Sequence, residues 1–201
     1  MRGMTIQKRA QLDIPGETTA PMEQSMERIE FALRKNQRIG IAGDYDCDGI
    51  TGVAQLLRFF LRRGVRPTVY LPHRVKDGYG LKPSIITAMG KLDLLMTVDT
   101  GVVAHEAIAL ARERGTDVIV IDHHHLPQNL PKATHILHPI LLNLPTPHPC
   151  ASGLVHMLLR VMAKKNGQAA WEGFDEDCAL AAIGTIADLV PLQGNNRALA
   201  Q

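Results

Sequence analysis

Residues 39–49 set the expected architecture, and they read Ile39-Gly40-Ile41-Ala42-Gly43-Asp44-Tyr45-Asp46-Cys47-Asp48-Gly49. The apolar beginning of this run predicts a short buried strand, and three carboxylates follow it at alternate positions. Alternation along an extended chain directs all three side chains the same way. Because like charges repel and are costly to bury without a partner, the run indicates a divalent cation site. Oxygen ligands suit Mg²⁺ or Mn²⁺, so we expect such a site at the carboxyl end of the strand.

The rest of the chain alternates between strand and helix patterns. Continuously apolar strands that alternate with helices indicate a parallel sheet covered on both faces. We therefore predict an α/β fold, a doubly wound and mainly parallel sheet with helices on both faces. The expected strands are 38–43, 68–71, 93–98, 117–121 and 134–137, and the expected helices are 22–36, one that ends before Gly64, 83–89, 105–114, 152–165 and 175–187. The helix before Gly64 should bury Val53, Leu56, Leu57, Phe60 and Leu61.

Composition narrows the class of protein. The 201 residues suit one domain, and a hydrophobic content of 45% is enough for a core. We assign residues 1–21 to a flexible N-terminal arm and 22–201 to the domain. Three widely spaced cysteines (Cys47, Cys150 and Cys178) argue against a disulfide framework and favour the cytoplasm. No apolar run has the length of a signal peptide or a membrane span. The net charge of +2 indicates no nucleic-acid surface but excludes no polyanionic substrate.

Three more acidic positions follow predicted strands or helices. Asp99 ends the strand at 93–98, Asp122-His123-His124-His125 ends the strand at 117–121, and Asp188 follows the last predicted helix. An open parallel sheet binds ligands beyond the carboxyl ends of its strands. Up to six acids and several imidazoles would therefore meet at one edge. Two divalent ions bridged by a carboxylate would neutralise that cluster, and two metals about 4 Å apart are a known device for cleaving phosphate esters.

Other interpretations of these residues remain open at this stage. Asp99 and Asp122, each taken alone, could be caps for the turns or helices that follow them. The three aspartates after residue 43 could also form a calcium loop. That loop needs a glutamate at its twelfth position, and here the twelfth position is Gln55. The joint occurrence of the acids at successive strand ends favours the metal site over both alternatives.

The sequence resembles a known family. Four segments resemble, in order and spacing, the four motifs of the DHH phosphoesterases, and the match runs from about Met22 to the last residue. Within that family the chain is similar to the RecJ branch, the single-strand-specific 5′-to-3′ DNA exonucleases. The four segments are 43–49, 98–101, 122–124 and 184–192. The form of the first motif, Arg74, Gly78-Tyr79-Gly80-Leu81 and Asn195-Asn196-Arg197 favour this branch.

The resemblance implies a set of roles. It implies two Mn²⁺ or Mg²⁺ ions, with Asp99 as the bridging carboxylate and His124 close to the scissile phosphate or the metal ligands. His123, His124 and Asp99 would be catalytic, and His125 would be a neighbour outside the motif. The implied metal ligands are Asp44, Asp46, Asp48, Asp99, His123 and Asp188. For Arg74 and Tyr79 we expect substrate contacts together with His124, since arginine suits a phosphate and tyrosine a base. The alternative is a solvated arginine and a packed tyrosine.

The implied function is metal-dependent hydrolysis of phosphodiesters. We expect the catalytic domain of a single-stranded-DNA exonuclease of DNA repair and recombination, with single-stranded nucleic acid as partner. Family members carry a second, C-terminal domain that grips the substrate, and residues 22–201 contain no candidate for it. A second domain or chain would then complete the cleft. The alternatives are a phosphodiesterase for oligonucleotides or cyclic dinucleotides, a pyrophosphatase, or an inactive homologue that serves as a binding module.

Overall fold

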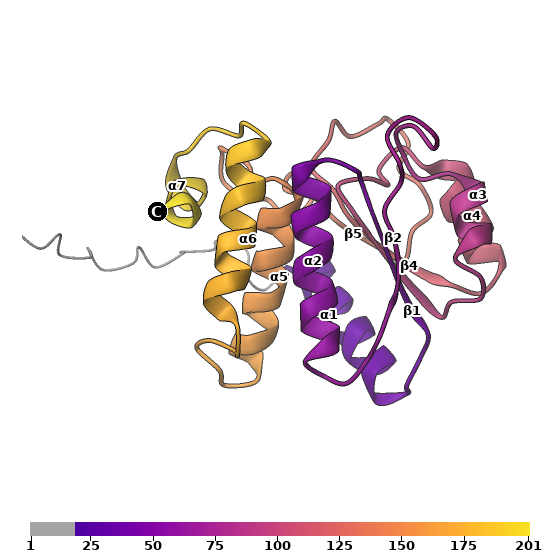
Figure 1. Cartoon of the computed structure of the whole chain (residues 1–201), viewed down its shortest axis with the longest axis horizontal. Coiled ribbons are helices and arrows are strands. Elements are labelled where there is room, and N and C mark those ends of the chain that lie inside the picture. The colour runs from indigo at the N-terminus through magenta and orange to yellow at the C-terminus, as the bar shows by residue number, and fades with distance from the viewer. Residues whose placement is uncertain (1–18) are drawn as a thin grey trace, which may run out of the picture.

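The computed structural model describes residues 19–201 and is built on one five-stranded parallel sheet. The strand order is β2-β1-β3-β4-β5, so the chain starts at an inner strand, adds β2 at one edge and places the remaining strands on the other side. Figure 1 shows the sheet between layers of helices. The predicted doubly wound α/β fold is therefore confirmed. The strands are β1 (Ile39–Gly43), β2 (Thr68–Tyr70), β3 (Leu94–Val98), β4 (Asp117–Ile121) and β5 (His135–Leu137).

The central strands are apolar because both of their faces are covered. Every residue of β1 and β3 is buried, whereas the short edge strand β2 is largely exposed. Ile41 pairs with Met96, and Met96 pairs with Ile119. These side chains lie in the larger of two hydrophobic clusters. Strands of this kind read as continuous apolar runs rather than as alternating patterns.

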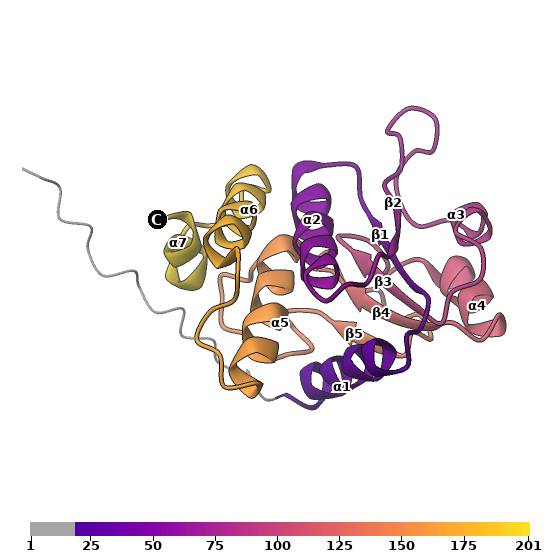
Figure 2. The ribbon, with the colours of Figure 1, turned by 60° about the horizontal axis from the view of Figure 1, so that its bottom comes forward.

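Helices cover the two faces of the sheet unequally. One face packs against α1 (Ala20–Arg34), α2 (Cys47–Leu61) and α5 (Ala151–Lys165), and the opposite face packs against α3 (Pro83–Ala88) and α4 (His105–Glu113). Figure 2 shows these two groups of helices on either side of the strands. Among residues 19–201, no helix combines the length and apolar content that a membrane crossing needs.

A third layer lies outside α2 and α5. It consists of α6 (Phe174–Ala187), which the sequence analysis predicted at 175–187, and the short α7 (Gly194–Ala200). The sequence analysis did not predict α7. The approach of α6 is very close at Gly184, where an added Cβ would lie 2.5 Å from Thr51 Oγ1 and 2.7 Å from Ser152 Cβ. At the other end of α6, buried Asp177 accepts hydrogen bonds from Arg58, Arg62 and the Trp171 indole. These contacts fix α6, and with it the segment that follows α6.

Several predicted details need correction. Ala20 and Pro21, assigned to the arm, form the first turn of α1, and the rest of the arm up to residue 18 lies outside the described residues. Leu61 is 43% exposed, although the periodicity placed it in the core. Phe59 is buried instead and packs edge-on against Phe60. Besides the sheet, α2 contacts both α5 and α6, so more of its circumference is buried than the single face that periodicity marks.

Candidate metal centre

The predicted acidic cluster lies at the switch point of the sheet. β1 and β3 are neighbours from which the chain departs in opposite directions, and Asp44 and Asp99 follow their carboxyl ends. In open α/β sheets the ligand site is the crevice at this point. His123 and His124 follow β4, the next strand along. Three neighbouring strand ends thus deliver their polar residues to one place.

Three groups of potential ligands meet there. The groups are Asp44, Asp46 and Asp99; Asp48, His123 and Asp188; and Asp99, His123 and His124. Within each group the ligand atoms all lie within 4.8 Å of one another. The six residues that the sequence analysis named as metal ligands are therefore brought together. Asp99 belongs to two of the groups, and His123 connects it to Asp48 and Asp188.

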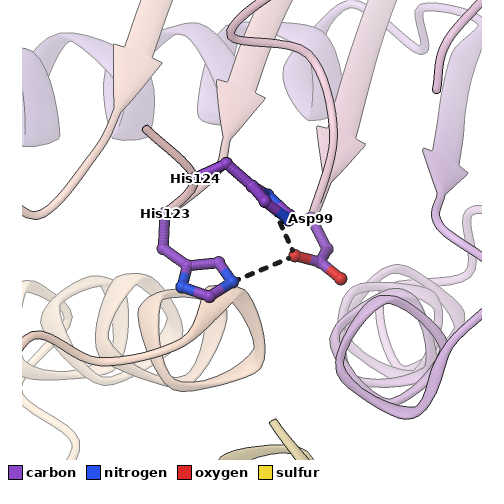
Figure 3. Close-up of side chains that lie close together, drawn as sticks. All are labelled: Asp99, His123 and His124. Carbon is purple, nitrogen blue, oxygen red and sulfur yellow. Dashed lines mark ion pairs between the residues drawn. The ribbon is translucent and has the colours of Figure 1, made fainter. Parts of the chain in front are cut away.

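Asp99 occupies the middle of the cluster. Its Oδ1 lies 3.2 Å from His123 Nε2 and 3.6 Å from His124 Nδ1, and Figure 3 shows both imidazoles directed at this carboxylate. The backbone at Asp99 is left-handed (φ 61°), a conformation that aspartate and asparagine tolerate better than most residues. Thr97 holds this turn because its hydroxyl donates to the Thr100 carbonyl at 2.7 Å. Asp99 does not cap α4, whose N-cap is Ala104, so the capping interpretation of Asp99 is wrong.

The three aspartates of the first motif have different surroundings. Asp44 is 3% exposed, and its Oδ1 has no hydrogen-bond partner within residues 19–201. Asp46 caps α2 and accepts the Gly49 amide at 3.0 Å. Asp48 is buried and accepts the amides of Ala151 and Ser152 at 2.8 and 2.7 Å. Asp48 is therefore fixed at the N-terminus of α5, where the helix dipole favours a negative charge. Its oxygens keep free lone pairs for a metal ion.

Asp122 supports the histidine segment instead of joining a ligand group. Its Oδ1 accepts the backbone amides of His123 and His124 and lies 2.8 Å from His124 Nδ1, and its Oδ2 accepts the Val102 amide. The capping interpretation of Asp122 is thus confirmed. His138, which the sequence analysis did not single out, donates from Nε2 to the His124 carbonyl at 2.8 Å. The sequence feature that could have identified His138 is its position directly after the predicted strand at 134–137.

The remaining predicted site residues lie around this cluster. Asp188 ends α6, and its Oδ2 lies 3.7 Å from His123 Nε2. The Tyr79 hydroxyl is 3.3 Å from His124 Nε2. Arg74 is exposed and stands 5.2 Å from the centre of the Tyr45 ring, near Asp44. His125 is exposed and belongs to none of the three groups. Arg74 and Tyr79 therefore stand at the margin of the cluster, on the loop after β2.

Burial and mutual repulsion disturb the titration of the cluster. Burial, reinforced by Asp48 and Asp46, raises the pKa of Asp99 to about 8 although His123 opposes the change. Burial likewise raises the pKa of Asp44 and of Asp188. Burial alone would lower the pKa of His123, but the carboxylates around it reverse the direction. The bond to Asp122 raises the pKa of His124 to about 9. The carboxyl groups of Asp44, Asp99 and Asp188 thus keep their protons to a higher pH than an exposed aspartate does.

The donor set fits divalent cations. Asp44 Oδ1, Asp99 Oδ1 and His123 Nε2 are buried and lack a hydrogen-bond partner in the described part of the chain. Carboxylate oxygens with one imidazole suit Mn²⁺ and Mg²⁺. A pair of ions that shared Asp99 would satisfy these atoms and remove the repulsion among the acids.

The raised pKa of Asp99 predicts an unusual pH dependence of stability. Between its ordinary value of 3.8 and about 8, the folded protein holds a proton that the unfolded chain has released. The Tm of the metal-free protein should therefore fall as the pH rises through this window. Added Mn²⁺ should reverse the trend, because it binds the deprotonated ligands. Thermal unfolding in chelator and in Mn²⁺ measures both effects. An equally steep fall for Asp99→Asn, which cannot titrate, would contradict this assignment.

Comparison with known proteins gives the geometry a family context. The model of the DHH family, N-terminal domain, matches residues 38–189. This range begins just before β1 and ends just after Asp188, so it contains every residue of the three ligand groups.

Curated and solved relatives carry the name RecJ. The chain is 36% identical over 189 residues to the single-stranded-DNA-specific exonuclease RecJ of Dickeya dadantii, a match that covers 88% of this chain and 33% of that protein. An exonuclease RecJ solved with manganese is 35% identical, with a TM-score of 0.82 over 90% of this chain and 46% of that one. RecJ of Thermus thermophilus solved with Mg²⁺ is 30% identical, with a TM-score of 0.61 over 96% of this chain and 23% of that one. The chain thus spans about a third of the curated relative's length.

Proposed function

Because the chain belongs to the DHH family, we propose that it is a metal-dependent phosphodiesterase domain of the RecJ type. The observation that carries the proposal is the position of Asp99 between two ligand groups: it belongs to the group of Asp44 and Asp46, and its Oδ1 lies 3.2 Å from His123, which belongs to the group of Asp48 and Asp188. Two divalent ions held by these residues would supply Lewis-acid chemistry for phosphate ester cleavage. Relatives solved with manganese and with Mg²⁺ support either ion as the cofactor.

The ligand groups suggest how the residues divide between two ions. Asp44 and Asp46 would hold one ion, Asp48, His123 and Asp188 would hold the other, and Asp99 would bridge them. The distances within each group and the unpartnered atoms of Asp44, Asp99 and His123 support this division. It matches the roles that the sequence resemblance implied.

The residues at the margin would act on the substrate. We assign to His124 contact with the scissile phosphate, because Asp122 fixes its ring and holds its pKa at about 9, which keeps it cationic at neutral pH. His123 and Asp99 would act at the reacting atoms through the ions. The exposed guanidinium of Arg74 suits a neighbouring phosphate of the strand, and Tyr79 suits a base or a phosphate. Charges fixed in place before the reaction stabilise the transition state without reorganisation.

The names of the relatives favour single-stranded DNA as the substrate. Digestion from the 5′ end, in repair and recombination, is what the resemblance to the RecJ branch implies. A second domain or chain would complete the cleft opposite the metal centre. Three free cysteines favour the cytoplasm as the location. Oligonucleotides, cyclic dinucleotides or pyrophosphate as substrates, or an inactive binding module, are the alternatives that the test below separates.

The test is product analysis with purified protein and Mn²⁺. Substrates are end-labelled single and double strands, a cyclic dinucleotide, pyrophosphate and bis-nitrophenyl phosphate. We expect release of mononucleotides from the 5′ end of single strands. We also expect little gain in kcat/KM with strand length, since remote binding energy needs a partner surface. If the metal-loaded protein hydrolysed none of these substrates, the proposal would be contradicted. Cleavage of only the cyclic dinucleotide or pyrophosphate would assign the protein to that substrate class instead.

Arg74→Ala tests the substrate contact. The arginine is exposed and packs loosely over Tyr45, so its loss should leave the fold unchanged. Binding of a single strand should weaken, and the slope of log K against log salt should fall by about 0.7, the value for one phosphate contact. Arg66→Ala, an exposed arginine before β2, is the matched control. An unchanged slope for Arg74→Ala would favour a solvated arginine.

A further inference from the structure

Asn196 of α7 is the most deeply buried residue of the segment after Asp188. It is 1% exposed, although the helix that carries it is short and ends the chain at the surface of the third layer (Figure 1). It belongs to the Asn195-Asn196-Arg197 motif, for which no role follows from the metal centre described above. It also lies beyond residue 189, where the match to the DHH family ends. Burial of an amide side chain calls for hydrogen-bond partners.

The Asn196 amide bonds two backbone segments at once. Its Nδ2 donates to the His148 carbonyl at 3.0 Å and to the Pro191 carbonyl at 3.2 Å. A bridge between two carbonyl oxygens needs two hydrogen-bond donors, and the NH₂ group of one asparagine side chain supplies both. Along the chain, the two segments are separated by the whole of α5 and α6.

Each bonded segment leads to a proposed metal ligand. Pro191 lies three residues after Asp188, on the turn that contains Leu189 in a left-handed conformation (φ 59°). His148 lies just before α5, whose first two amides hold both oxygens of Asp48. Asp48 and Asp188 belong to the same ligand group with His123. Asn196 thus links the segment that precedes α5, whose amides bind Asp48, to the segment that follows Asp188.

We propose that Asn196 is a positioning residue that sets the separation of Asp48 and Asp188, and thereby the affinity of the metal site they share with His123. The proposal rests on the proposed function, because it assumes that these residues bind an ion. According to the proposal, α7 helps to hold the metal ligands in place. α7 contacts α6, and its Leu199 lies close to Gly153 of α5. Residues that only orient metal ligands typically change affinity by about 10–100-fold when they are replaced.

A matched pair of variants tests the proposal in the full chain. Asn196→Asp keeps the shape but loses both donors, and Asn195→Asp adds the same charge to the same turn without touching either bond. Titration calorimetry with Mn²⁺ should show that Asn196→Asp weakens one of two sites by about 10–100-fold, whereas Asn195→Asp binds like the parent. Equal affinities of Asn196→Asp and the parent for both ions would overturn the proposal.

Amide exchange in the metal-free protein separates positioning from general stability. In Asn196→Ala the Ala151 and Ser152 amides should exchange about tenfold faster, with the second half of α5 unchanged. Uniformly faster exchange, or unfolding of the variant, would mean that Asn196 only stabilises the fold and would overturn the proposal. If the parent binds no Mn²⁺, the proposed function fails, and this measurement still decides whether Asn196 fixes the start of α5.

Discussion

Asp99→Asn should abolish the binding of two divalent ions while the protein keeps its fold. Asparagine is the best replacement here because the backbone at Asp99 is left-handed, which alanine would tolerate poorly. The amide keeps one oxygen but loses the negative charge between the two ligand groups. Loss of a residue that merely supports a ligand costs about 10–100-fold in affinity or activity, so loss of the shared ligand should cost more. Titration with Mn²⁺ and the rate of single-strand hydrolysis measure the two effects.

The Tm of metal-free Asp99→Asn is the control for its fold. Neutral asparagine avoids both the cost of burying a charge and the repulsion by Asp48 and Asp46, which together raise the pKa of Asp99. The metal-free variant should therefore unfold at or above the temperature of the parent. A loss of activity with a lowered Tm would indicate a folding defect instead. Two ions bound by Asp99→Asn as tightly as by the parent would show that Asp99 does not bridge them.

The sequence predicted the sheet because hydrophobic patterns report burial directly. β1, β3 and β4 are covered on both faces, and their continuous apolar runs were recognisable without any tertiary information. The positions of Asp44, Asp99 and His123 followed from the same argument, since parallel strands place their carboxyl ends at one edge. The structure brings these residues together, as the strand ends predict.

The parts that the sequence did not predict depend on contacts between distant segments. Phe59 is buried on a helix that contacts α5 and α6 as well as the sheet, and periodicity within α2 cannot show those helix contacts. The anchoring of Asp48 by the amides of α5 is a hydrogen bond across about a hundred residues, and backbone donors carry no sequence signal. α7 has seven residues, too few for a hydrophobic period to identify.

His123→Ala should reduce phosphodiester hydrolysis to background. His123 is the residue that connects the two ligand groups, with Nε2 3.2 Å from Asp99 Oδ1, 3.6 Å from Asp48 and 3.7 Å from Asp188. Removing the imidazole takes away one proposed ligand and the group that lies between the carboxylates of Asp48, Asp99 and Asp188. Truncation of Asp188 should have the same effect on turnover. Initial rates with end-labelled single strands and saturating Mn²⁺ measure the loss.

His125→Ala is the matched control, because it is the same residue type two positions away, exposed and outside the ligand groups. It should keep parental activity and metal stoichiometry. Loss of the His123 imidazole opens no cavity in the hydrophobic core, so circular dichroism of His123→Ala should remain native. If His123→Ala retained substantial turnover, or if His125→Ala lost as much, the histidine that completes the site would have been misassigned. We expect only His123→Ala to lose activity, because His123 Nε2 lies within 4 Å of three carboxylates. Within residues 19–201, no other imidazole belongs to the group of Asp48 and Asp188.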